Sequence, residues 1–196
     1  MKHLFFLLLG ITLSFPAFSQ LEKRTWLLGA NGNMYWYQEK YKNPSVNYNL
    51  KYISIDLSAS VGYFFAKKFA GGIRPYLFFE EGRGSLSGNT NNFKVAAGPF
   101  VRYYFLSGEK QFNLLADLGY QLGMNKVLLV EETKGRINIL SAMGGIEAFF
   151  NSSVGLEFLI GYKNQIITSN NSGYNSNKKG FQASIGFHFH LEKELK

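Results

Sequence analysis

The sequence predicts an all-β fold: a transmembrane antiparallel up-and-down β-barrel of eight strands, with short periplasmic turns and long extracellular loops. Three observations predict it. Long segments alternate apolar and polar residues with a period of two, as strands with one apolar face do. Aromatic residues fall at both ends of the apolar faces, and short and long connections alternate along the chain. These features together are typical of a barrel that crosses an outer membrane.

The N-terminal segment predicts export. A short basic start is followed by an apolar run over 4–15, a break at Pro16 and small residues before Gln20. We predict that residues 1–19 are a signal peptide cleaved between Ser19 and Gln20, and that 20–196 form one barrel domain. A retained anchor is the alternative, but the run is shorter than the roughly 20 apolar residues of a spanning helix.

The amino-acid composition excludes several other classes of protein. The chain has 196 residues and no cysteine, which excludes disulfides and a lipid-modified cysteine. After the signal no run of about 18 apolar residues remains, which excludes helical spans. Aromatic residues make up 17% of the chain and the formal charge is +8. Because the basic residues form no dense patch, we expect attraction to anionic lipid headgroups and no nucleic-acid binding.

Eight segments carry the alternation. They are 26–37, 53–63, 69–80, 93–105, 111–123, 138–150, 154–163 and 180–191. The second is the clearest: Ile53, Ile55, Leu57, Ala59, Val61 and Tyr63 alternate with Ser54, Asp56, Ser58, Ser60 and Gly62. Short turns are predicted around 66–68, 106–110 and 151–153, and long polar loops around 38–52, 81–92, 124–137 and 164–179. The third loop contains an apolar stretch at 127–130, so its flanking strands could extend as a ribbon.

A soluble β-sandwich also alternates, so the apolar faces need a separate argument. The predicted strands run about 10 to 13 residues, longer than the usual 5 or 6 and enough to cross a bilayer. The aromatic residues form two girdles at the level of lipid headgroups. The lower girdle has Trp26, Tyr63, Phe69, Tyr103, Phe105, Phe112, Phe150 and Phe189, and the upper has Trp36, Phe79, Phe93, Tyr120, Tyr162 and Phe181. The apolar faces are therefore predicted to meet lipid.

The inward faces carry charges of both signs. The predicted polar network in the lumen comprises Asp56, Arg74, Lys94, Arg102, Asp117, Glu147 and Glu157. We expect these groups to satisfy one another, with Asp56 beside Arg74 and Arg102 beside Asp117, and to fill the narrow bore. A path for protons or ions is the alternative.

Two histidines on the last segment are candidates for a catalytic or metal-binding role. His188 and His190 share one face of the strand, but the sequence offers no matching third ligand, and His190 is predicted at the periplasmic rim. We therefore predict no catalytic residue, no cofactor and no metal.

The stretch Gly98–Phe105, together with the Ser-Gln junction, resembles the outer-membrane protein β-barrel domain family. This family includes the small OmpX-like and OmpA-like barrels. The resemblance implies a location in the cell outer membrane of a Gram-negative organism, but it implies no activity. Ser184, Gly186, Phe189 and Leu191 are similar to the C-terminal signal read by the barrel assembly machinery, although the chain continues to 196 where many such proteins end on an aromatic residue.

We accordingly expect a protein that is not an enzyme, with a structural or surface-interaction role carried by its extracellular loops. The alternatives are a narrow porin-like channel and a subunit of a larger secretion or adhesion complex. A lipid A-modifying enzyme is disfavoured, because the chain lacks the His-x-Ser pairing of the deacylases. Expected partners are outer-membrane lipid and lipopolysaccharide, and, during biogenesis, periplasmic chaperones and the assembly machinery. The sequence names no protein partner.

Overall fold

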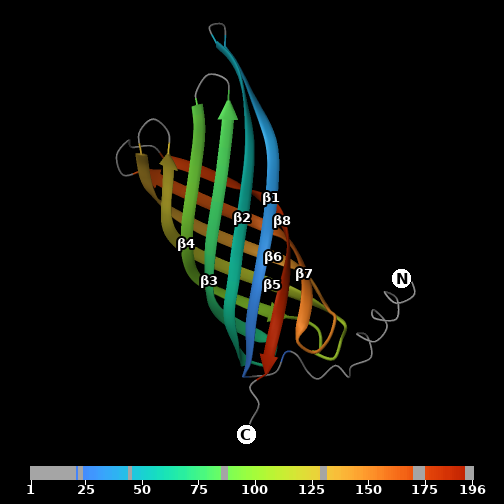
Figure 1. The fold of residues 1–196 in the computed structure, drawn as a ribbon. Coiled ribbons are helices and arrows are strands. Elements are labelled where there is room, and N and C mark those ends of the chain that lie inside the picture. Colours follow the sequence, from blue (N-terminus) through green and yellow to red (C-terminus); the bar gives the residue numbers. More distant parts are fainter. Residues whose placement is uncertain are drawn as a thin grey trace, which may run out of the picture.

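The computed structural model is a closed barrel of eight antiparallel strands (Figure 1). It describes residues 21, 24–43, 46–84, 88–128, 132–169 and 175–192, so the predicted signal peptide and its cleavage site lie outside the described residues. The strands are β1 (Thr25–Asn43), β2 (Val46–Ala66), β3 (Phe69–Gly84), β4 (Gly88–Tyr104), β5 (Phe112–Leu128), β6 (Glu132–Phe149), β7 (Val154–Ser169) and β8 (Asn175–Glu192). The predicted fold class is confirmed. In the described ranges, no helix is long and apolar enough to cross a membrane.

Each strand pairs with its neighbours in sequence, and β1 also pairs with β8. One ladder of paired residues runs from Phe181 through Tyr162, Ala142, Leu118, Val101, Gly71, Tyr63 and Trp26 to Leu191. The ladder therefore returns to β8 further along the strand than it started. This stagger is what a barrel of tilted strands requires in order to close.

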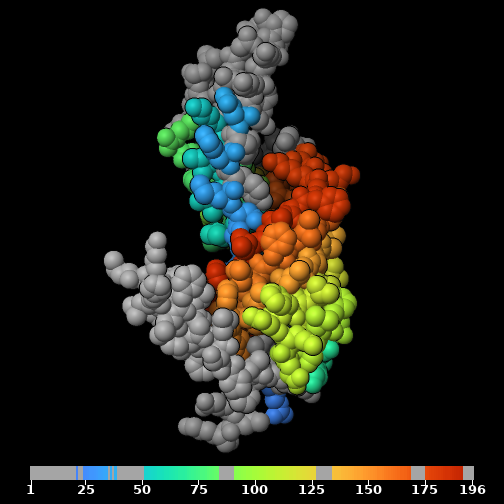
Figure 2. All heavy atoms as spheres, turned by 90° about the vertical axis from the view of Figure 1, so that its right-hand side faces the viewer, coloured from blue at the N-terminus to red at the C-terminus, as the bar shows by residue number. Residues whose placement is uncertain are grey.

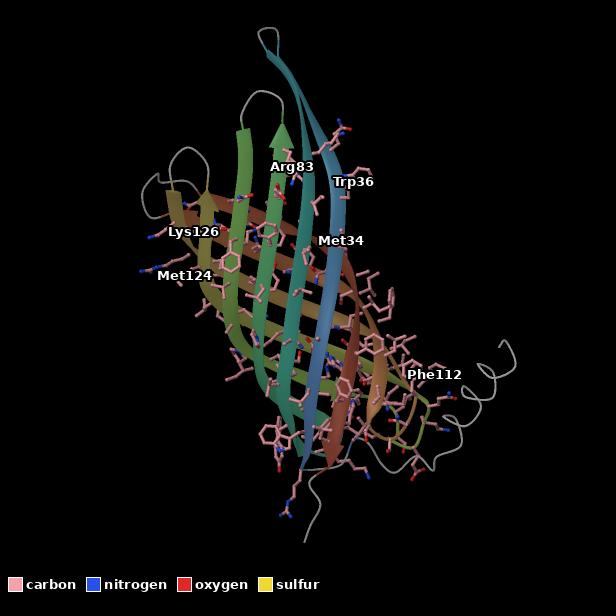
Figure 3. The ribbon with its side chains drawn as sticks, in the orientation of Figure 1. Met34, Trp36, Arg83, Phe112, Met124 and Lys126 are labelled. Atoms are coloured by element: carbon pink, nitrogen blue, oxygen red, sulfur yellow. The ribbon has the colours of Figure 1, made fainter. Side chains whose placement is uncertain are left out.

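The strands present the predicted apolar side chains to the outside. On β2, Leu57 and Val61 are exposed, while Ser54 and Ser60 are buried in the lumen. The aromatic residues of the two predicted girdles also point outward. Figure 3 shows Trp36 on the upper half of β1 and Phe112 near the lower end of the barrel. The Trp26 and Tyr63 rings meet edge to face, with their centroids 5.3 Å apart.

The strands extend well beyond the predicted segments at the upper end. Residues 38–43, predicted as loop, pair with residues 46–51, and the other three upper connections are likewise shortened by paired strand. β1 and β2 rise highest (Figure 1). The prediction of long loops was wrong over 38–52, 81–92 and 164–179, whereas the ribbon considered for 124–137 is present, with β5 and β6 paired up to Leu128 and Glu132. Beyond the apolar belt both faces of a ribbon can meet water, so a strand can continue there without apolar alternation.

The lower connections are short, as predicted. Lys67 and Lys68 join β2 to β3, and Lys68 adopts a φ of 64°. Between β6 and β7, the Asn151 side chain accepts hydrogen bonds from the backbone amides of Ser153 and Val154, each at 2.8 Å.

Candidate functional site

An apolar cluster occupies the lower half of the bore, where its members alternate with the charged side chains. It contains Leu21, Leu27, Phe64, Ala70, Phe100, Tyr104, Leu115, Met143, Phe149 and Leu159, all buried. Leu21 precedes β1 and is held across the base, because its carbonyl accepts a hydrogen bond from the Lys68 amide (3.0 Å). The sequence pattern did not reveal this cluster, because inward positions were assigned by polarity. Its lower members, among them Leu21, Phe64 and Phe149, close the lower end of the lumen, whereas Phe100, Met143 and Leu159 lie above the charged residues of their strands.

Arg102, on β4, is the centre of a charged cluster in the bore. Its Nε donates to Asp117 Oδ2 (2.9 Å), and its Nη1 pairs with Glu157 Oε2 (2.5 Å). The same Nη1 lies 2.9 Å from Nδ1 of His188. The side chains of Arg102, Asp117 and Glu157 have no solvent exposure. One guanidinium thus joins strands β4, β5, β7 and β8 across the barrel.

Arg74 completes the pairing of Asp117. Its two terminal nitrogens donate to the two carboxylate oxygens of Asp117 at 2.6 and 2.7 Å, a bidentate geometry. Its Nε donates to Ser60 (3.1 Å), and its guanidinium lies over the Phe100 ring, 4.4 Å from the centroid. The predicted Arg102–Asp117 contact is present. The predicted Asp56–Arg74 contact is not, because Asp117 and Ser60 occupy the donors of Arg74.

Glu147 anchors the lower part of the cluster. It accepts a hydrogen bond from the Tyr104 hydroxyl (2.7 Å), and its Oε1 lies 2.9 Å from Nε2 of His190. His190 lies near the lower rim, as predicted, where its amide donates to the Ser153 carbonyl (2.7 Å), but its side chain is buried in the lumen. The position is determined by Glu147 and by the rings of Phe64 and Phe149, which lie 5.8 and 5.2 Å from the imidazole.

The structure brings two carboxylates to His188, for which the sequence pattern offers no third ligand. Ligand atoms of Glu147, Glu157 and His188 all lie within 4.8 Å of one another. The Arg102 guanidinium already lies against Glu157, however, and the Asn31 amide donates to the other oxygen of that carboxylate (2.7 Å). Arginine thus supplies the positive charge at the point where a cation would bind. The geometry is that of an ion-pair network.

Two glycines make room for this cluster. A Cβ built at Gly29 would overlap the His188 ring, and one built at Gly155 would overlap the Glu147 carboxylate. The inward glycines of the strands therefore set the space into which the charged side chains fold. Two guanidiniums face three carboxylates here, and one protonated imidazole would bring the cluster to zero net charge. Such a cluster can fill the bore and join the strands across it.

A second, smaller network lies higher in the lumen. Lys163 Nζ pairs with Asp56 Oδ2 at 3.1 Å, and the Tyr76 hydroxyl donates to the same oxygen at 3.1 Å. Lys163 is absent from the predicted network although it is the partner of Asp56. Between the two networks lies a polar cavity of about 50 Å³, enough for a few water molecules.

Lys94 is the remaining member of the predicted network. It is 2% exposed, and its ammonium group lies over the Phe78 ring at 4.0 Å from the centroid. Within the residues that the structure describes, no carboxylate forms an ion pair with Lys94. The seven predicted residues all face the lumen, but Lys94 stands apart from the two networks.

Two of the solved structures that resemble this chain are small outer-membrane proteins. Neisserial surface protein A has 15% sequence identity and a TM-score of 0.49, over 85% of this chain and 97% of that one. The outer membrane protein OprG from Pseudomonas aeruginosa has 15% identity and a TM-score of 0.46, over 90% of this chain and all of that one. No protein-family model and no curated protein matches the sequence. The resemblance to OmpX-like and OmpA-like barrels stays a prediction.

Proposed function

We propose that this chain is an integral outer-membrane protein without catalytic activity, which acts as a structural element and contacts its surroundings through its upper surface. The observation that carries the proposal is the inversion of polarity across the barrel wall. Apolar side chains cover the outside, and ion pairs occupy the inside. Water-soluble proteins bury these two classes of side chain the other way round.

The outer face supports a lipid environment. Every strand exposes large apolar or aromatic side chains, for example Trp36 on β1, Ile73 on β3 and Leu118 on β5. A continuous apolar belt of this kind exceeds the patches that monomeric soluble proteins expose. The paired ladders also satisfy the backbone groups that hydrocarbon cannot, at every strand junction except that of β1 with β8 above Gly32.

The lumen argues against an open channel. A hydrated ion moving upward from the periplasm would meet the lower members of the apolar cluster, then the Arg102 cluster, and then Phe100, Met143 and Leu159. These layers are buried and joined by hydrogen bonds or packing. Displacing a buried ion-pair partner costs about 3–5 kcal/mol, so this plug is not expected to open spontaneously to a useful extent.

The upper end offers a surface for interaction. Exposed basic residues there include Lys51, Arg83, Lys178 and Lys179. Positive charge just above the apolar belt is suited to the phosphate groups of lipopolysaccharide. Arg83 also forms an exposed pair with Glu81 (2.7 Å), so part of this charge is already compensated.

Planar-bilayer recordings test the proposal most simply. The mature chain, refolded in detergent and shown to be folded by heat-modifiable gel migration, should give no stable conductance steps. A matched double variant, Arg102→Met with Glu157→Gln, removes one ion pair of the plug without changing the net charge. It serves as the positive comparison, in which conductance steps would show that the recording detects a weakened plug. Stable steps in the unmodified protein that vanish when Arg74 and Arg102 are replaced would instead establish a channel.

Two further assays test for enzymatic activity and for membership of a larger complex. Release or transfer of acyl chains from purified lipid A would establish a lipid A-modifying enzyme and overturn the non-catalytic part of the proposal. Stoichiometric recovery of other outer-membrane proteins with the tagged chain from intact membranes would make it a subunit of a secretion or adhesion complex.

A further inference from the structure

The barrel wall is paired over only part of its height between β1 and β8. The ladder that joins these strands begins at Thr25 with Glu192 and ends at Gly32 with Ile185. Above Gly32, β1 continues to Asn43. Among the residues that the structure describes, this part of β1 pairs only with β2, and the facing part of β8 pairs only with β7. In Figure 2, β1 (blue) and β8 (red) diverge in the upper half of the molecule.

The strands separate within the apolar belt. Trp36 on β1 and Phe181 on β8 belong to the upper aromatic girdle, and both lie above the last paired residues. In hydrocarbon each unpaired backbone group costs several kcal/mol, so an open edge at this level needs polar partners. One is present: with its amide turned to satisfy its neighbours, the Asn33 side chain donates to the Ala183 carbonyl (2.9 Å).

A hollow of about 620 Å³ lies behind this opening. Its outer rim is apolar and unusually exposed: Met34 is 71%, Trp36 78% and Phe181 85% exposed. Figure 3 shows Met34 and Trp36 along the upper half of β1. At Gly180, which also lines the hollow, an added Cβ would meet no atom within 4 Å. The opening thus leads sideways out of the barrel between apolar side chains.

The inner wall of the hollow is basic. Four lysines line it, Lys94, Lys163, Lys178 and Lys179, together with two acids, Asp56 and Glu80. Lys163 is already paired with Asp56. Lys94 is different, because it is almost fully buried and lies over Phe78 without a carboxylate partner among the described residues. The Glu80 and Asp56 carboxylates act on this ammonium group only from beyond ion-pair distance. Its burial is therefore only partly compensated, and an anion in the hollow would relieve the remaining cost.

We propose that this hollow binds the anionic head of a membrane amphiphile, which enters sideways between β1 and β8. The carboxylate or phosphate pairs with Lys94, assisted by Lys163 and Lys178. The acyl chain leaves the barrel past Met34, Trp36 and Phe181 into the outer leaflet. The combination of an apolar exit with a basic inner wall distinguishes an amphiphile from a free anion or an uncharged lipid. Because the lumen below is plugged, the site binds its ligand without opening a path to the periplasm.

The two tryptophans allow a direct test. A Trp26→Phe variant retains Trp36, at the rim, as the only tryptophan. The refolded full mature chain, in nanodiscs of zwitterionic phosphatidylcholine, is titrated with ω-bromoundecanoate, whose bromine quenches tryptophan fluorescence on contact. Saturable quenching is expected. Bromoundecanol, which has the same tail and no charge, should quench only by non-saturable partition.

Two variants test the contributions of the charged headgroup and of the acyl chain separately. Lys94→Met should weaken the bromoundecanoate affinity about ten-fold, as loss of one charge-assisted contact does. Lys110→Met, an exposed lysine in the lower β4–β5 connection, should leave it unchanged. Gly180→Leu fills open space at the rim and should weaken binding while leaving heat-modifiable migration intact. This variant keeps the test valid if Lys94→Met folds poorly.

Competition experiments identify whether the bound headgroup is a phosphate or a carboxylate. Displacement of the probe by dodecyl phosphate at lower concentration than by dodecanoate would assign the site to phosphate-bearing lipids, and the reverse order would assign it to fatty acids. If inorganic phosphate displaced the probe at the same concentration as dodecyl phosphate, the acyl chain would contribute nothing to binding, and the proposed acyl exit would be refuted. Absence of saturable quenching, equal affinity of the acid and the alcohol, or equal affinity of Lys94→Met and the unmodified chain would overturn the proposal as a whole.

Discussion

Replacement of Arg102 by methionine tests the lumen network at its centre. Arg102 is 1% exposed and touches Asp117, Glu157 and His188. Methionine fills a similar volume but donates no hydrogen bond, so Glu157 loses its guanidinium partner and Asp117 keeps only Arg74. Removing one partner of a buried ion pair costs about 3–5 kcal/mol. We expect the free energy of unfolding to fall by about this amount.

The assay is equilibrium unfolding in urea of the chain refolded in lipid vesicles, followed by tryptophan fluorescence and by heat-modifiable gel migration. Arg83→Met is the matched control, because Arg83 forms an exposed ion pair and its loss should change stability very little. The double variant Arg102→Met with Glu157→Gln should recover a large part of the loss, since no orphaned charge remains. Equal stability of Arg102→Met and Arg83→Met would refute the reasoning.

Three further predictions follow from the wall, the lumen and the base. Ala59→Arg puts a charge on the lipid face and should lower the free energy of unfolding by about 2–4 kcal/mol, whereas Ala116→Leu should be tolerated. An unchanged free energy of unfolding in Ala59→Arg would mean that the outward register assigned to β2 is wrong. Gly29→Ala should destabilise by about 1–3 kcal/mol, because the new Cβ overlaps the His188 ring; an unchanged urea midpoint would show that the ring lies elsewhere. Phe64→Ala should cost about 3–5 kcal/mol, because Phe64 is fully buried in the base cluster; a loss below about 1 kcal/mol would contradict the packing there.

The fold could be predicted because the membrane imposes its pattern on every residue of the wall. A period of two, strands long enough to cross a bilayer and aromatic ends together require apolar faces outward and a closed sheet. This constraint ends where the lipid ends. Residues 38–43 and 46–51 pair above the membrane without apolar alternation, and polarity alone therefore suggested a loop.

Partner choice in the lumen could be predicted only in part. Arg102 and Asp117 lie opposite each other on neighbouring strands, and their contact follows from register. Lys163 and Asp56, by contrast, lie on β7 and β2 and meet across the bore. Such contacts depend on barrel diameter and tilt, which a linear pattern does not contain. The lateral opening was missed for a similar reason, since it depends on where the pairing of the first and last strands ends.

The apolar cluster at the base shows another limit of the pattern. Leu27, Phe64 and Leu115 face inward although they are hydrophobic, because below the charged cluster the bore is closed by packing. Alternation in β5 and β6 is correspondingly weaker, with Leu115 and Met143 inside and Leu114 and Ile146 outside. An apolar residue in a small barrel is therefore not sufficient evidence for a lipid-facing position.

The central claim is that alternate residues of each strand meet hydrocarbon, and site-directed spin labelling measures this directly. Because the chain contains no cysteine, a single cysteine can be placed in turn at each position of 57–61 on β2 and labelled with a nitroxide in lipid vesicles. The structure predicts high collision rates with oxygen at 57, 59 and 61 and low rates at 58 and 60. Uniform rates, the opposite alternation, or a mature chain that stays monomeric in buffer without detergent would contradict it.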